Sequence, residues 1–182
     1  MRSCIALALA LWIGSGAAAG AANASPGPAG TATCAAPQFH MLDFWRGTWR
    51  VTVGKEYAGT DIVSREAGGC ALTERWADAD GGQGYSLFFF DAFAGRWQQI
   101  WVSDRATQAG GLKYKTLVAT FPDGGVRFAG ILPSPPGTAP VLDRTTLTPL
   151  RDGTVHQVIE ISKDGGQTWI DGFDAIYHRQ KE

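Results

Sequence analysis

The chain has 182 residues, of which 45% are hydrophobic and 18% are charged, with 16 Lys and Arg against 17 Asp and Glu. This length favours a single domain, and the near-neutral charge excludes the basic surface with which proteins bind DNA, RNA or an anionic membrane. The high apolar content and low charge also exclude an intrinsically disordered chain.

The first 24 residues have the order of a secretory signal peptide. A short basic start precedes an apolar run at 5–13, and Ala22-Asn23-Ala24 supplies a small-residue cleavage site. The apolar run is too short to cross a bilayer, and we expect no stable membrane insertion elsewhere. The predicted product is periplasmic or secreted. Its parts are a signal peptide at 1–24, a flexible Ala/Pro/Gly-rich segment at 25–37 and one domain at 38–182.

Two cysteines, Cys34 and Cys70, are left once Cys4 is removed with the signal peptide. Two cysteines in an exported chain have one intramolecular pairing, and disulfides persist in the oxidising compartments that such chains enter. We therefore predict a Cys34–Cys70 disulfide that ties the N-terminal segment to the domain. The alternative is two unconnected thiols.

Clusters of Gly, Pro and Asp divide the rest of the chain at intervals of about ten residues, a spacing typical of all-β sandwiches and barrels. The segments between them are rich in Val, Ile, Thr and aromatic residues, and none keeps helical spacing over three turns. A short helical turn is expected over 38–44. Strands are predicted at 45–53, 59–66, 70–78, 84–92, 96–104, 112–121, 126–132, 141–149, 154–162 and 167–179.

The short links between these ten strands favour an antiparallel up-and-down meander. Closure of such a sheet into a barrel removes its exposed edges, and a barrel of this size holds either side chains or one small ligand. The longest break is the Pro-rich loop at 133–140, and no long Greek-key crossover is visible. We therefore predict an all-β fold, a closed barrel of about ten strands.

Alternation divides each strand into two faces but does not identify the inner one. Gln99 and Trp101 share a face of the fifth strand, and Glu74 and Trp76 share a face of the third. The fourth strand, at 84–92, carries apolar residues on both faces. We expect it to be covered by the N-terminal segment or by a second subunit, so a homodimer is one interpretation.

Several polar residues lie in mid-strand beside aromatic residues. Buried polar groups need hydrogen-bond partners, so this set suits either a self-satisfied network in a packed barrel or a pocket that orients a ligand. The sequence leaves both interpretations open. In the second, the partner is a small, largely apolar molecule. The candidate ligand-binding residues are Glu74, Trp76, Ser86, Gln99, Trp101 and Gln157.

The start of the first strand, Gly47-Thr48-Trp49, matches the G-x-W signature of lipocalin-like, or calycin, barrels. The wider segment 44–49 resembles the FW-x-G-x-W opening of the DUF1579 family, exported bacterial proteins of unassigned function. The resemblance implies a calycin-like barrel in which Trp49 plugs the floor beneath a basic residue of the last strand, here Arg179.

Three further blocks resemble segments of the same family. They are its GC-A-x-x-E-x-W segment at 69–76, its W-x-Q-x-W-V strand at 97–102 and its C-terminal pattern at 155–177. His156, Ile159 and Ala175 depart from that pattern. The departures concern a shared ligand rather than the fold.

Residues 162–169 fit S-x-D-x-G-x-T-W, the Asp-box of sialidase propellers. A propeller needs several repeated blades, and this chain has one Asp-box and no internal repeat. We interpret the motif as a hairpin stabiliser in which Asp164 caps a tight turn and Trp169 packs beneath it.

The three histidines, His40, His156 and His178, lie on separate segments without metal-ligand spacing. We expect no metal and no resident cofactor, and a binding protein rather than an enzyme. The enzyme alternatives are a nitrobindin-like barrel that binds haem through His178 and a carboxylate-assisted site that uses Glu74.

Overall fold

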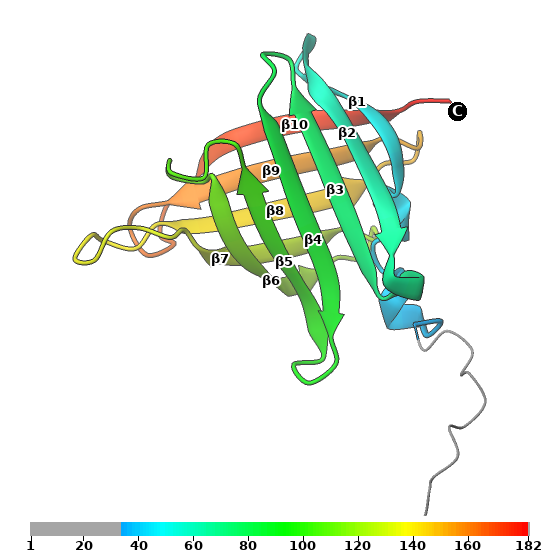
Figure 1. The fold of residues 1–182 in the computed structure, drawn as a ribbon, viewed down its shortest axis with the longest axis horizontal. Helices are drawn as coiled ribbons and strands as arrows, with labels where there is room; N and C mark the ends of the chain where they lie inside the picture. The colour runs from blue at the N-terminus through cyan, green and yellow to red at the C-terminus, as the bar shows by residue number, and fades with distance from the viewer. Residues whose placement is uncertain (1–33, 182) are drawn as a thin grey trace, which may run out of the picture. The chain divides into compact units, whose positions relative to one another are not determined.

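The computed structural model describes residues 34–181 as a closed barrel of ten strands (Figure 1). Three short 3-10 turns accompany the barrel: η1 (Pro37–His40), η2 (Asp43–Trp45) and η3 (Ala67–Gly69). The strands are β1 (Gly47–Val53), β2 (Glu56–Glu66), β3 (Ala71–Asp78), β4 (Gln83–Asp91), β5 (Arg96–Ser103), β6 (Leu112–Thr120), β7 (Val126–Ile131), β8 (Leu142–Pro149), β9 (Val155–Ser162) and β10 (Ile170–Arg179).

Every strand pairs antiparallel with its neighbours in the chain, and β1 closes the barrel against β10. The predicted fold class is therefore confirmed. The predicted signal peptide at 1–24 lies outside the described residues, as does the 25–33 part of the predicted flexible segment. The rest of that segment is described, and Pro37 already begins η1.

The barrel has two different ends. Because consecutive strands run in opposite directions, the links after β1, β3, β5, β7 and β9 gather at one end, and the remaining links gather at the other. We call the end with η1, η2 and η3 the closed end, and the other the open end. The long links at the open end are the loops 104–111, 132–141 and 163–169; the yellow β7–β8 loop projects there, away from the blue turns of the closed end (Figure 1).

Aromatic side chains fill the closed end. Trp45, Trp49, Phe88, Trp97 and Tyr177 are each no more than 1% exposed. The Trp45 ring makes edge contacts with Phe88 and with Tyr177, at centroid distances of 5.3 and 6.3 Å. Burial of such large side chains supplies much of the hydrophobic stabilisation of a small barrel.

Arg179 lies against Trp49 at the closed end. Its guanidinium is 4.2 Å from the centre of the Trp49 ring and donates to the carbonyl oxygens of Arg46 and Phe44. Gly47 has a φ of 138°, and a Cβ there would overlap this guanidinium. The start of β1 therefore requires glycine, and Arg179 stands where the G-x-W resemblance implies a basic residue.

The predicted disulfide is present between Cys34 and Cys70, with 5.1 Å between their Cα atoms. It joins the segment before η1 to the residue after η3, so it fastens the N-terminal segment to the closed end. Within residues 34–181, no helix has both the length and the apolar character that a membrane crossing requires.

The N-terminal segment covers the inner face of β4 at the closed end. Phe90 packs against Phe39 of η1 with 5.1 Å between ring centroids, and it lies on the same face of the strand as Phe88, two residues earlier. This contact leaves the outer face of β4, which the expected cover concerned, exposed at Tyr85 and Leu87. The outer faces of β4, β5 and β6 expose neighbouring apolar side chains, which are Tyr85, Leu87, Ile100, Val102 and Tyr114.

The Asp-box forms the β9–β10 hairpin. One carboxylate oxygen of Asp164 accepts from the backbone N–H of Thr168 at 2.9 Å, and the other accepts from the Thr168 hydroxyl at 2.5 Å. Trp169 donates to the carbonyl of Gly166 and lies under the Arg144 guanidinium, which is 3.9 Å from its ring centre. Because this turn extends to Trp169, β10 begins at Ile170 rather than at 167 as predicted.

Candidate ligand cavity at the open end

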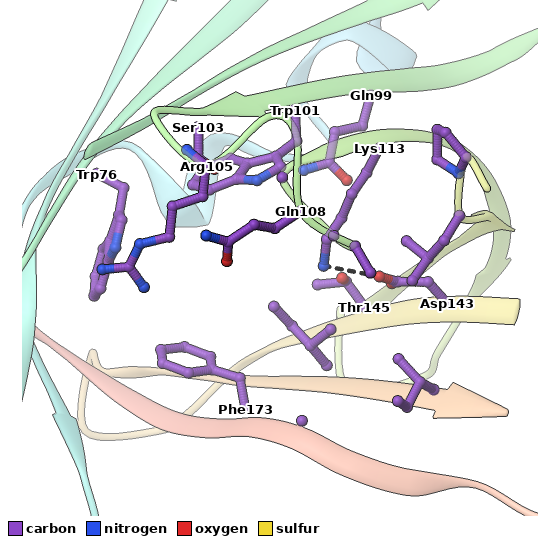
Figure 2. A pocket seen from close by; sticks show the side chains of 18 of the residues that line it. Trp76, Gln99, Trp101, Ser103, Arg105, Gln108, Lys113, Asp143, Thr145 and Phe173 are labelled. Atoms are coloured by element: carbon purple, nitrogen blue, oxygen red, sulfur yellow. Dashed lines mark hydrogen bonds and ion pairs between the residues drawn. The ribbon is translucent and has the colours of Figure 1, made fainter. Parts of the chain in front are cut away.

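A cavity of about 590 Å³ occupies the open-end half of the barrel (Figure 2). Residues of β3, β5, β6, β8, β9 and β10 and of the loops 104–111 and 132–141 line it. Its volume falls within the range of roughly 300–1,000 Å³ that small-molecule sites occupy. The interior is therefore neither fully packed nor an open channel.

The cavity wall is largely aromatic and aliphatic. Trp76, Trp101 and Phe173 surround it from three strands, as Figure 2 shows, and Trp76 makes an edge contact with Phe173 at 6.0 Å. Gly84 makes room for Trp101, because a Cβ at Gly84 would lie 2.0 Å from the indole ring. The indole is thus held against the sheet, and the space beside it stays open.

A layer of polar side chains separates this cavity from the closed-end core. Along the strands most of its members occupy the next inward position after a core residue: Glu74 comes two residues after Leu72, and Thr145 two residues before Leu147. The members, which we call the polar layer, are Asp61, Glu74, Ser86, Gln99, Lys113, Lys115, Asp143, Thr145, Gln157 and Tyr177.

Two lysines share one carboxylate in this layer. The Lys113 ammonium lies 2.8 Å from one oxygen of Asp143, and the Lys115 ammonium contacts the other oxygen and donates to the Thr145 hydroxyl. The side chains of Lys115 and Asp143 are each 1% exposed. Burial lowers the pKa of Lys115 to about 8, and the charge of Lys113 acts in the same direction, whereas Asp143 opposes both.

Two buried carboxyl groups, Asp61 and Glu74, form the other half of the layer. Burial raises the pKa of Glu74 to about 7, against the hydrogen bond from Ser86 and the charges of the two lysines. Burial, followed by the charge of Glu74, raises the pKa of Asp61 well above its usual range. Burial therefore favours the protonated form of Asp61 and disfavours a second negative charge beside Glu74.

A hydrogen-bonded chain links Glu74 to the cavity. The Ser86 hydroxyl donates to Glu74, and the Gln99 amide nitrogen donates to the Ser86 oxygen at 3.2 Å. The amide oxygen of Gln99 is buried, and no described residue donates a hydrogen bond to it. Nearby, the Tyr177 hydroxyl donates to the side-chain oxygen of Gln157 at 2.7 Å.

Five of the six candidate ligand-binding residues border the cavity, namely Glu74, Trp76, Gln99, Trp101 and Gln157. Ser86 is fully buried behind them and positions Glu74 and Gln99 rather than lining the space. These polar side chains therefore form a network at the floor of a pocket, and the barrel is not packed throughout.

The histidines lie away from the cavity. His178 places its Nε2 3.2 Å from the Thr52 hydroxyl, His156 pairs with Asp174, and none of the three histidines is among the lining residues. A haem ligated by His178 would therefore sit outside the cavity. Among residues 34–181, no group of three or more His, Cys, Asp or Glu has the arrangement of a metal site.

Sequence reasoning missed four charged members of the polar layer, Asp61, Lys113, Lys115 and Asp143. All four stand within strands and have an apolar or aromatic residue beside them in the sequence, as Lys113 and Lys115 have Tyr114 between them. In the sequence, these charges alternate with residues that are equally suited to the interior, so either face of the strand could point into the barrel. A charged side chain in a strand ordinarily faces solvent, and this expectation favours the wrong face.

No protein-family model matches the chain, and the search of curated proteins found no match to it. The resemblance to the DUF1579 family thus stays a prediction.

Proposed function

We propose that this protein is a lipocalin-like binding protein that holds one small, largely apolar molecule in the open-end cavity. The observation that carries the proposal is the cavity of about 590 Å³, walled by Trp76, Trp101 and Phe173 and floored by the polar layer. An enclosed apolar wall with a few convergent polar groups is the usual composition of a small-molecule site.

The division of the interior supports binding rather than packing alone. At the closed end, aromatic side chains of the same kind are fully buried against one another. At the open end, Trp76 and Trp101 stay partly exposed to the cavity, so their apolar surface is available to a ligand. Removing that surface from water would contribute roughly 25 cal/mol per Å² to binding.

Export also fits this proposal. Disulfides such as Cys34–Cys70 persist in oxidising compartments, and the predicted signal peptide would direct the chain to such a compartment. We place the protein in the periplasm or outside the cell, where a closed barrel with one open end can take up and release an apolar molecule.

The test is a titration with N-phenyl-1-naphthylamine, an uncharged probe that fluoresces when it leaves water. We expect saturable binding of one probe per chain. Gly84→Ala should weaken it by roughly tenfold or more, because the new methyl group pushes the Trp101 indole into the cavity. Leu87→Ala, on the outer face of the same strand, is the matched control and should bind as the unmodified chain does.

Near-ultraviolet circular dichroism shows whether both variants keep the barrel. Absence of probe binding to the unmodified chain would contradict the proposal. Equal binding by a folded Gly84→Ala variant would place the probe elsewhere, and would contradict it as well.

A further inference from the structure

We propose that the polar layer selects ligands whose polar end is uncharged and pairs a hydrogen-bond donor with an oxygen acceptor, as a primary carboxamide does. This inference rests on the proposed function, since it names the class of molecule that the cavity takes. It is built on three features of the layer: the orientation of Gln99, the position of Lys113 and the balance of buried charge.

The first feature is the orientation of Gln99. The Ser86 hydroxyl has a single proton, which it donates to Glu74, so its oxygen can only accept from a neighbour. Gln99 must therefore turn its NH₂ group toward Ser86 and its oxygen away from it. That oxygen is buried without a donor, in a side chain that is 8% exposed and borders the cavity. A ligand N–H or O–H group would satisfy it.

The second feature is the ammonium group of Lys113, which borders the cavity on the neighbouring strand. It has three N–H donors, and its ion pair with Asp143 at 2.8 Å engages one side of the group (Figure 2). In the pairing of β5 with β6, Gln99 lies opposite Lys115, so Lys113 is its diagonal neighbour. Diagonal neighbours are within reach of one another's side chains, so one small polar group can accept from Lys113 while it donates to Gln99.

The third feature is the balance of charge. Lys113 and Lys115 carry two positive charges, against one negative charge on Asp143 and one shared by Glu74 and Asp61. Burial also keeps the Tyr177 hydroxyl protonated. The layer is therefore close to neutral near pH 7.5. A ligand carboxylate would add an unpaired negative charge beside Glu74, and a ligand ammonium would add a positive charge beside Lys113.

The test compares three probes that share one apolar body: 2-naphthamide, 2-naphthoate and 2-methylnaphthalene. Their affinities are measured at pH 7.5 by displacement of N-phenyl-1-naphthylamine. We expect the amide to bind roughly tenfold or more tightly than either of the others, because it alone satisfies Gln99 and Lys113 without adding charge.

Gln99→Met keeps the length of the side chain and removes both its donor and its acceptor. We expect the affinity for the amide to fall to that for 2-methylnaphthalene, whose own affinity stays unchanged. Gln98→Met is the matched control, since Gln98 accepts from Thr116 on the outer face and should keep the preference for the amide. If Gln99→Met does not fold, Ser86→Ala replaces it. Loss of the hydroxyl frees the Gln99 amide to rotate and should reduce the preference several-fold.

Lowering the pH gives a second readout. Below the pKa of Glu74, about 7, this carboxyl gains a proton, and Lys115 becomes fully charged. Both changes make the layer more positive. Binding of 2-naphthoate should therefore strengthen between pH 7.5 and pH 6, most of this gain should disappear in Glu74→Gln, and binding of the amide should change little.

The outcomes separate this inference from the proposed function. If no probe binds, the proposed function fails and the inference fails with it. If all three probes bind equally, if 2-naphthoate binds most tightly at pH 7.5, or if folded Gln99→Met retains the preference, the cavity binds ligands but the inference about the polar end is wrong.

Discussion

The two ends of this barrel use the same kind of side chain for opposite purposes. At the closed end, Trp49 and Trp97 are fully buried, and their indole N–H groups donate to the carbonyls of Trp45 and Gln38. At the open end, Trp76 and Trp101 border the cavity. The difference arises because the N-terminal turns cover one end and nothing comparable among the described residues fills the other.

This contrast teaches that a tryptophan at an inward position of a strand does not by itself predict packing. What decides its role is whether a further segment supplies the remaining contacts. η1 and η2 do so at the closed end, held by the disulfide and by the contact of Phe39 with Phe90. The closed end should therefore account for stability and the open end for binding.

The largest effect should come from truncation of a closed-end tryptophan. Trp49→Ala removes a fully buried ring that contacts Tyr177 and Arg179, and should lower the free energy of unfolding by about 3–5 kcal/mol. Trp101→Ala, at the open end, should lower it by less, about 1 kcal/mol, because this partly exposed ring borders the cavity and leaves a smaller loss of packing. Urea unfolding followed by circular dichroism measures both, and equal losses would refute the contrast between the ends.

The disulfide should come next. Replacement of both Cys34 and Cys70 by Ala opens a link across 36 residues, which the chain-entropy relation values at about 4 kcal/mol. Urea unfolding measures the loss. Because the cysteines lie at the closed end, the variant that remains folded should bind N-phenyl-1-naphthylamine as the unmodified chain does. Loss of probe binding in a folded variant would show that the two ends are coupled.

The pH dependence of stability should show a smaller effect, which originates in the polar layer. The pKa of Glu74 is raised from 4.5 to about 7, so its contribution to stability is fully present below pH 4.5 and is lost as the pH rises to 7. This loss amounts to about 3 kcal/mol at 1.36 kcal/mol per pKa unit. Glu74→Gln should remove it, as urea unfolding at pH 5 and pH 8 would reveal.

Glu160 provides the control of opposite sign. It lies on the outer face of β9, where hydrogen bonds from Arg144 hold its pKa below the usual range. Its contribution is present above its ordinary pKa and is lost as the pH falls, so Glu160→Gln should leave the change between pH 5 and pH 8 nearly intact. Identical profiles for the unmodified chain and Glu74→Gln would contradict the assignment of a raised pKa to Glu74.

The strands could be predicted because the turns between them have strong local signals. Gly, Asp and Pro clusters mark the links, and all ten strands begin within three residues of their predicted starts. The disulfide could be predicted because two cysteines are left when the predicted signal peptide is set aside. The start of β2 was placed late because Gly54-Lys55 forms a two-residue turn, and pairing resumes at Glu56.

The polar layer could be predicted only in part. Alternation placed Glu74 with Trp76 and Gln99 with Trp101, but it does not say which face of a strand points inward. That choice depends on barrel closure and on partners far away in the chain, such as Asp143 for Lys113 and Lys115. Within its own strand, each of these charged residues looks like one on an exposed face. Their burial becomes visible only when β6 and β8 are placed on either side of β7, which brings the two lysines to Asp143.

The central claim is that the open end holds one small molecule. Native mass spectrometry of the protein isolated from its own cells, without denaturation, tests it most directly. The account predicts a species heavier than the polypeptide by one small molecule, with the 2 Da loss of the Cys34–Cys70 bridge, and the same species absent from folded Gly84→Ala. The account would be contradicted if the unmodified chain carried only its own mass and also failed to take up added N-phenyl-1-naphthylamine.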